Sequence, residues 1–248
     1  MTEPKLLVER NDGVLTLVLN RPSKLNAIDN ELAESLCNAL DAAAVDVSVR
    51  AIRIRGNGRA FCAGRDVSEA PTERDLELVQ AVAKSIVGNP KPVVAAVHGW
   101  TVGAGLEWML NADIVVAAED ARFKLTEASI GVFVTGGLVA TLPAAVGLSR
   151  AKALMLLGEE FSARQAVDWG LVYKVVPTAE LDAVSLNACH RLASLRPQVA
   201  AQFKRVLNMF GLERFDKAID EESAVQRALG RDDGSQETPS ASLIRPCA

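Results

Sequence analysis

The segment from Pro92 to Asp113, PVVAAVHGWTVGAGLEWMLNAD, decides the fold of this chain. It begins with the β-branched apolar run from Val93 to Val97 and passes through a glycine-rich turn, from Gly99 to Gly105. It then resumes as an apolar segment with a single acid, Glu107. This pattern predicts a buried strand that leads into the first turn of a buried helix. The amides and the dipole at such a helix start favour negative charge, so we expect an anion-stabilising turn beside a carboxylate.

Three common glycine-rich motifs do not fit this turn. A dinucleotide-binding GxGxxG motif would need a third glycine where Trp108 stands. A P-loop needs a Gly-Lys pair, which the sequence lacks, and a nucleophile elbow needs a serine between two glycines. The turn is therefore expected to bind a standing or a developing anion through its backbone amides.

Composition narrows the possible functions. The 248 residues are 49% hydrophobic and only 4% aromatic, which suits one large domain with an aliphatic α/β core. A net charge of −4 without a block of like charge argues against general binding to nucleic acid or to a membrane surface. Four scattered cysteines without a C-x-x-C pair, and no recognisable signal peptide, predict reduced thiols in the cytoplasm and no zinc site.

The periodicity of the remaining chain predicts a mixture of strands and helices. Residues 6–8 and 14–19 flank Asn11-Asp12-Gly13, which is a strong hairpin signal. Asp29 is expected to cap a helix, and residues 72–87 read as an amphipathic helix. Other strands are expected at 51–54, 114–117, 122–125 and 171–175, and other helices at 136–146, 150–157 and 163–169. Three further helices are expected to begin near Ala179, Pro197 and Phe215, and residues from about 231 are expected to lack fixed structure.

Several motifs together resemble the crotonase (enoyl-CoA hydratase/isomerase) superfamily up to about Asp233. They are NRPSKLNAID (20–29), AFCAGRD (60–66), HGWTVGAGLE (98–107), EDARFKLTEASIG (119–131), LPAAVG (142–147) and SARQAVDWGLVYKVV (162–176), in the family's order. The resemblance implies an α/β fold with a spiral of repeated β-β-α units over residues 1–195. It also implies a helical region over residues 196–230 that assembles homotrimers or dimers of trimers. The composition of residues 231–248, rich in Asp, Ser, Gly and Pro, predicts a flexible tail.

The resemblance also implies a reaction centre. By position, it places the acyl thioester oxygen between the backbone amides of Ala63 and Ala104, where an enolate would be stabilised. The two acids of the hydratase members fall on Glu107 and Glu127, which can activate water and deliver a proton. Because an isomerase can manage with one acid, the pair favours an enoyl-CoA hydratase.

Coenzyme A enters as part of the thioester substrate, and the resemblance implies neither another cofactor nor a metal. Lys24 and Arg65 lie in loops that the family places near the nucleotide, although either side chain could simply be solvated surface charge. Asp66 could touch the substrate or tie its own turn together. Lys204 and Arg205 could reach coenzyme A across a subunit boundary. The implied substrate-binding residues are Lys24, Ala63, Gly64, Arg65, Asp66, Ala104 and Thr135.

The chain departs from the hydratase pattern around the second acid. Residues 134–139 read VTGGLV where the family has PGAGGT, so Thr135 replaces a glycine whose amide helps to hold water. Trp108 beside Glu107 either narrows the acyl site or fills the core. These departures keep open an isomerase, or a hydrolase that cleaves a carbon–carbon bond of a cyclic diketone. A relative that binds acyl-CoA or RNA without turnover is a third possibility.

Other interpretations compete at single residues. Glu127 could cap the helix that follows it, and Cys62 and His98 are interpreted as packed residues without a catalytic role. The family's C-terminal Glu-Gly-x-x-Ala-Phe segment reads ETPSAS at 237–242, which puts in doubt any contribution of this segment to binding.

Overall fold

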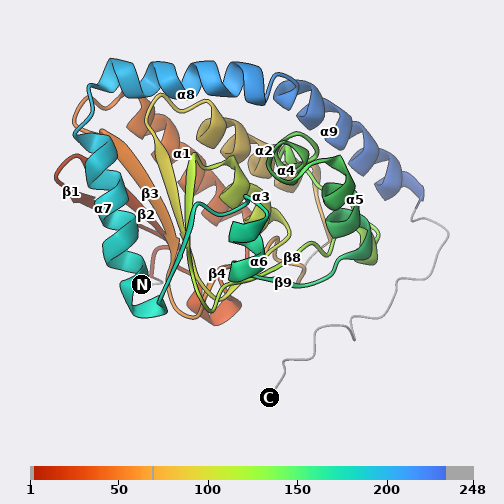
Figure 1. Ribbon diagram of the computed structural model, residues 1–248. Coiled ribbons are helices and arrows are strands. Elements are labelled where there is room, and N and C mark those ends of the chain that lie inside the picture. Colours follow the sequence, from red (N-terminus) through yellow and green to blue (C-terminus); the bar gives the residue numbers. More distant parts are fainter. Residues whose placement is uncertain (1–2, 69, 233–248) are drawn as a thin grey trace.

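The computed structural model describes residues 3–68 and 70–232 and shows two sheets surrounded by helices (Figure 1). The main sheet has the strand order β1-β2-β3-β5-β7-β10 and the second sheet the order β4-β6-β8-β9. The main strands are β1 (Leu6–Asn11), β2 (Val14–Leu19), β3 (Ala51–Gly56), β5 (Val93–Val97), β7 (Ile114–Ala118) and β10 (Lys174–Val176). The short strands of the second sheet are β4 (Ala60–Cys62), β6 (Trp100–Val102), β8 (Arg122–Lys124) and β9 (Phe161–Ser162). The predicted mixed α/β architecture is confirmed.

The main sheet begins with the predicted hairpin. β1 and β2 pair antiparallel, and Asp12 and Gly13 between them have φ angles of 46° and 79°. Positive φ at both turn residues gives the chain reversal that the Asn-Asp-Gly sequence predicts. The following neighbours, from β2 to β10, all pair in parallel. Strands β2 and β5 are buried along their whole length, as expected for strands of a sheet covered on both faces.

Helices cover both faces of this sheet (Figure 1). On one side α1 (Asn30–Val45), α2 (Glu73–Val87) and α3 (Ala104–Asn111) bury the largest apolar cluster. On the other side α7 (Leu181–Ala193) buries a smaller cluster against β3, β5 and β7. Asp29 caps α1 as predicted, because its carboxylate accepts the Leu32 amide at 2.9 Å. Thr72 and Asp75 form a capping box at the start of α2.

The Pro92–Asp113 segment contains one element more than its sequence predicts. β5 and α3 lie where the pattern places a strand and a helix, but the expected turn between them includes β6. β6 pairs in parallel with β4 and β8, so its partners come from distant parts of the sequence. A three-residue strand has no periodicity of its own, which explains why the pattern indicates only a turn.

The second half of the chain is mainly helical. Its helices are α4 (Leu138–Val146), α5 (Leu148–Leu157), α6 (Ala163–Asp168), α7, α8 (Pro197–Gly211) and α9 (Phe215–Asp232), joined in places by short 3-10 turns. The strand expected at 171–175 is β10 at 174–176, because the amides of Leu171 and Val172 bond to the Ala166 carbonyl instead. α8 and α9 run in succession along the outside of the molecule (Figure 1).

The predicted domain boundaries can be located on the helices, although the fold does not test them as limits of domains. The division at 195/196 falls between α7 and α8. α9 ends at Asp232, two residues past the predicted end of the helical region. The rest of the predicted tail, 233–248, lies outside the described residues. Within the described part of the chain, no helix is both long and apolar enough to cross a bilayer.

Candidate functional site

Glu107 lies in the first turn of α3 and is only 1% exposed. Its Oε2 atom accepts a hydrogen bond from the Thr135 amide at 3.1 Å and another from the Gly136 amide. A Cβ atom at Gly136 would lie 2.6 Å from this Oε2, so the close approach of the loop requires glycine. One turn later, Asn111 donates to the Gly136 carbonyl at 2.9 Å. The loop before α4 therefore orients the Glu107 carboxylate.

Glu127 follows β8 and reaches the same region from the second sheet. A Cβ atom at Gly103 would lie 2.6 Å from Glu127 Oε1, so the carboxylate rests against the residue that precedes α3. Gly103 has a φ of +51°, a conformation that favours glycine. Glu127 Oε2 is buried and has no hydrogen-bond partner among the described residues. Its side chain makes no capping bond to the 3-10 turn at Ala128–Ile130, so the interpretation of Glu127 as a cap is wrong.

The two carboxyls share one electrostatic environment. Burial raises the pKa of Glu107 well above its ordinary 4.5, and the charges of Glu127 and Glu222 raise it further. The hydrogen bonds from the Gly136 and Thr135 amides lower this pKa, but by less. Burial also raises the pKa of Glu127. Close buried carboxyls cannot easily ionise together, so the pair titrates as a unit and holds protons above the usual range. One protonated and one ionised carboxyl is the arrangement that acid–base catalysis needs.

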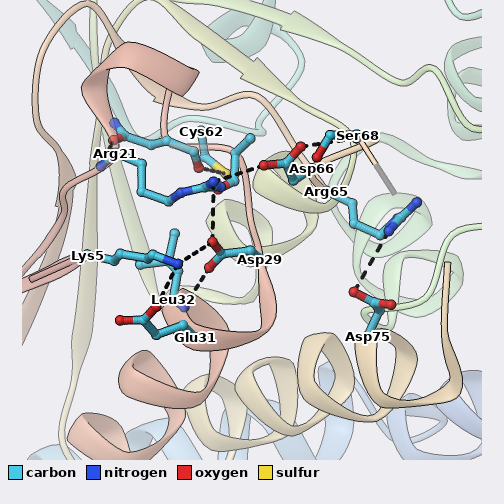
Figure 2. Close-up of polar contacts among 12 residues, drawn as sticks. Lys5, Arg21, Asp29, Glu31, Leu32, Cys62, Arg65, Asp66, Ser68 and Asp75 are labelled. Atoms are coloured by element: carbon cyan, nitrogen blue, oxygen red, sulfur yellow. Dashed lines mark hydrogen bonds and ion pairs between the residues drawn. The ribbon is translucent and has the colours of Figure 1, made fainter. Parts of the chain in front are cut away.

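The turn at 60–66 is held by the loop at 20–29 (Figure 2). Arg21 lies between Asp66 and Asp29, with Nη2 at 2.9 Å and 3.2 Å from their Oδ2 atoms. Asn26, which is fully buried, donates to the carbonyls of Asn57 and Ala60. The sequence marks residues 20–29 only as a polar loop, and Asn26 gives no periodic signal of its role in fixing the turn.

The same loop occupies the Ala63 amide. The N–H of Ala63 donates to the Leu25 carbonyl at 3.0 Å, so it does not point to a free site as the predicted oxyanion donor should. Ala104 suits its predicted role better, because it is the first residue of α3 and its N–H has no acceptor within the helix. Ala104 and Gly64 are neighbours, since a Cβ atom at Gly64 would lie 3.6 Å from the Ala104 nitrogen. The structure thus brings the two predicted turns together.

The charged residues predicted for coenzyme A have different surroundings. Lys24 is exposed at the end of a 3-10 turn, Pro22–Lys24. Arg65 pairs with Asp75 across 3.8 Å (Figure 2). Hydrogen bonds from Ser68, and then from Arg21, lower the pKa of Asp66 to about 2. Asp66 therefore ties its own turn together, which is the second of the two roles considered for it from the sequence.

Three further residues were predicted to bind the substrate or to reach coenzyme A, and their contacts differ. Thr135 directs its amide at Glu107 itself. Lys204 is buried and binds Asp113 at 2.9 Å and the Ile86 carbonyl at 2.8 Å, so the prediction that it reaches coenzyme A is wrong. Arg205 donates to Gln202 on its own helix. A lysine surrounded by apolar helical positions can be buried only with such partners, and sequence spacing does not reveal them.

The competing interpretations of Trp108, Cys62 and His98 are also settled by their contacts. Trp108 is 2% exposed and donates to the Val79 carbonyl at 3.3 Å, so it fills the core. Burial raises the pKa of Cys62 to about 12, which is the opposite of nucleophile activation. His98 Nε2 lies 2.8 Å from the Gly58 carbonyl oxygen in the turn between the sheets. All three are packed residues, as interpreted for Cys62 and His98.

Sequence reasoning missed a third buried acid, Glu222 of α9. Its Oε2 accepts the Gly137 amide at 2.7 Å and its Oε1 accepts the Val139 amide at 2.9 Å, and burial raises its pKa. The surrounding sequence, DEES, reads as a charged and solvated helix face. Only the packing of α9 on the start of α4 distinguishes Glu222 from its neighbours.

Comparisons with known proteins agree over nearly the whole chain. A family model described as enoyl-CoA hydratase/isomerase matches residues 9–243. The 1,2-epoxyphenylacetyl-CoA isomerase of Escherichia coli (strain K12) is 33% identical over 243 residues, covering 94% of this chain and 93% of that protein. The 2,3-dehydroadipyl-CoA hydratase of the same strain is 39% identical over 209 residues, covering 82% and 81%. The crystal structure of an enoyl-CoA hydratase from Mycobacterium avium subsp. paratuberculosis K-10 matches with a TM-score of 0.87 at 33% identity, covering 92% and 90%.

Proposed function

The chain belongs to the enoyl-CoA hydratase/isomerase family of enzymes, and from this premise we propose that it adds water to the double bond of a 2-enoyl-CoA thioester. The similar proteins include both a hydratase and an isomerase, so their names do not choose between the two reactions. The observation that carries the proposal is the pair of close acids with raised pKa, Glu107 and Glu127. Hydration needs a base for water and an acid for carbon, and two carboxyls that share protons supply both.

The proposed reaction forms a bond between the water oxygen and the β-carbon of the thioester. One proton of the water passes to the ionised carboxyl of the pair, and the α-carbon receives a proton from the protonated carboxyl. Charge collects meanwhile on the thioester oxygen, and the Ala104 amide, at the first position of α3, would stabilise it. The Ala63 amide, predicted as the second donor, must first release the Leu25 carbonyl. Coenzyme A is part of the substrate, and no other cofactor is invoked.

Matched acid-to-amide variants test this proposal. Glu107→Gln and Glu127→Gln should each lower kcat for a 2-enoyl-CoA by about 10²- to 10⁴-fold, because each removes a proton-transfer group. Binding of the saturated acyl-CoA, measured by calorimetry, should change little. The control is Glu119→Gln, an exposed acid in the same segment, which should keep full activity. Undiminished turnover in either site variant would contradict the proposal, as would acyl-CoA binding by the wild-type enzyme without turnover of any enoyl-CoA.

A second candidate function keeps the site and changes the reaction. The similarity to 1,2-epoxyphenylacetyl-CoA isomerase favours an isomerisation, and Thr135 in the loop that holds Glu107 keeps cleavage of a cyclic diketone as a further form of this alternative. Trp108 no longer supports this alternative, because it packs in the core. Product identification with a panel of enoyl-CoAs and cyclic diketones separates these reactions. Turnover of diketones without affinity for coenzyme A would favour the hydrolase.

The predicted assembly into trimers, or dimers of trimers, is part of the proposal. α8 leaves a row of apolar side chains exposed, which suits burial against another subunit. These side chains are Val199, Phe203, Leu207, Met209 and Phe210. Light scattering after size-exclusion chromatography should give three or six times the mass of one chain, and a monomer would contradict this part. A cytoplasmic location stays a prediction from the scattered cysteines.

A further inference from the structure

Helix α9 lies along the loop that holds Glu107. Gln226 Oε1 accepts the Phe133 amide at 2.7 Å, at the start of the loop. Glu222 accepts the amides of Gly137 and Val139 at its end. At Gly137 itself, the ring of Phe215 occupies the space that a side chain would need. Three side chains of one helix therefore fix a segment of seven residues, 133–139, made of the loop before α4 and the first two residues of α4 (the 133–139 loop).

The contacts form a short chain from α9 to the catalytic acid. Glu222 holds Gly137 and Val139, and the two amides just before Gly137, those of Thr135 and Gly136, hold Glu107. Four amides of one loop thus bind two buried carboxylates, which lie on α3 and α9. Because the two carboxylates bind consecutive amides of this loop, a shift of Glu222 reaches Glu107 through the backbone.

We propose that Glu222 is a positioning residue of the active site, which anchors the 133–139 loop so that the loop amides keep Glu107 in its reactive orientation. This inference rests on the proposed function, because it assumes that Glu107 transfers a proton. It assigns a role in catalysis to the C-terminal helix, which contributes no group to the reacting atoms.

Glu222 also acts on Glu107 through its charge. Among the described residues, the acids that face Glu107 are Glu127, which follows β8, and Glu222 on α9. Each raises the pKa of Glu107, after the larger effect of burial. Removing the charge of Glu222 should therefore lower the pKa of Glu107. The limb of the pH–rate profile that reports the acid pair should then move to lower pH.

The test is Glu222→Gln in the full chain, assayed with a 2-enoyl-CoA over a range of pH. Gln keeps the size of Glu222 but turns an amide N–H toward one of the loop amides, so we expect kcat to fall about 10- to 100-fold. KM should stay within about threefold, because the substrate-binding groups are untouched. The control is Glu221→Gln, which removes the same charge from an exposed neighbour and should change neither kcat nor the pH profile. Ser223→Ala is a second control, because Ser223 is buried on α9 but bonds Gln80 of α2.

A measurement independent of turnover separates this inference from the proposed function. Carboxyl ¹³C NMR of glutamate-labelled enzyme follows the titration of Glu107, which the Glu107→Gln variant assigns. If wild type turns over no enoyl-CoA, the proposed function fails, but the NMR titration still tests the coupling. A folded Glu222→Gln variant with wild-type kcat and wild-type Glu107 titration would overturn the inference. If Glu222→Gln does not fold, Gln226→Ala loosens the same loop with the charge intact, and an unchanged kcat there would overturn it.

Discussion

The two acids proposed to be catalytic, Glu107 and Glu127, differ in how the protein holds them. Glu107 belongs to a helix, is almost fully buried, and has its carboxylate bound by two amides of the 133–139 loop. Glu127 belongs to an irregular segment after β8, and its buried Oε2 has no partner among the described residues. A buried polar atom without a partner is uncommon and marks a place where a ligand can bind. The contrast indicates that Glu107 is fixed by the protein, whereas Glu127 keeps one oxygen without a protein partner in the described part of the chain.

This difference also has a consequence for stability. The amides that orient Glu107 lower the energy of its ionised form, but burial and two neighbouring acids oppose ionisation more strongly. Holding an ionised Glu107 in this place therefore lowers the stability of the folded protein, which is typical of functional sites. A glycine lies against each carboxylate: Gly136 contacts Glu107, and Gly103 contacts Glu127. Any side chain at these two positions would meet the carboxylate.

The largest expected effect concerns the coupling between the acids. If they act as one unit, the double variant Glu107→Gln/Glu127→Gln should lose about as much kcat as the worse single variant, roughly 10²- to 10⁴-fold. The second substitution adds little because the first has already removed the shared proton. The three kcat values, measured with one enoyl-CoA at one pH, decide this. Losses that multiply in the double variant would show that the acids work independently.

The sequence predicts the parts of this arrangement that depend on local signals. The Asn11-Asp12-Gly13 hairpin and the Asp29 cap are found where their residues indicate. The motif positions also indicate that Glu107 and Glu127 lie in one region. Glu107 follows β6 and Glu127 follows β8, and these two strands pair in parallel. β6 was missed, since its partners lie far away in sequence. Glu222 was missed because its helix looks solvated until α4 packs against it.

The engaged Ala63 amide shows a different limit. Family position identifies a turn, but it does not show which N–H of the turn is already used. The Leu25 carbonyl that accepts this N–H belongs to a loop where Leu25 and Asn26 both have positive φ. Positive φ is common enough for Asn, but for a bulky residue such as Leu25 it is exceptional and is held by the surrounding structure. No pattern in residues 20–29 could therefore predict where that carbonyl points.

The two glycines allow the contrast to be tested with matched substitutions. In Gly136→Ala the new Cβ meets Glu107 Oε2 at 2.6 Å, and the loop amides leave that carboxylate little freedom to move. We expect kcat to fall about 10- to 100-fold. In Gly103→Ala the new Cβ meets the end of Glu127, which can turn away, so the main effect should be backbone strain of about 1–3 kcal/mol. Steady-state kinetics and urea unfolding of both variants measure the two effects, and a larger kcat loss in Gly103→Ala would reverse the assignment of the rigid acid.

The pH dependence of stability should reveal the cost of burying Glu107. Its pKa in the folded protein is raised above 4.5, so its contribution to stability is complete below that pH and is lost as pH rises through the raised value. Glu107→Gln resembles the protonated form and cannot lose this contribution. The Tm of the variant should therefore exceed that of wild type by an amount that grows with pH, on the order of 2–4 °C for about 1 kcal/mol. Calorimetry at several pH values measures the gap, and a gap that shrinks with rising pH would contradict the direction of the pKa shift.

The smallest expected effect lies in the turn at 60–66, away from the acids. Asp66→Asn keeps an acceptor for the Ser68 amide but weakens the ion pair with Arg21, so we expect a loss of about 0.5 kcal/mol at neutral pH. The pKa of Asp66 is lowered from 3.8 to about 2, so the wild-type advantage is present above pH 3.8 and is lost as pH falls toward 2. Urea unfolding at pH 7 and pH 3 measures both values. KM for the acyl-CoA should not change, because Asp66 holds its own turn, and a clear rise in KM would return Asp66 to the substrate-binding residues.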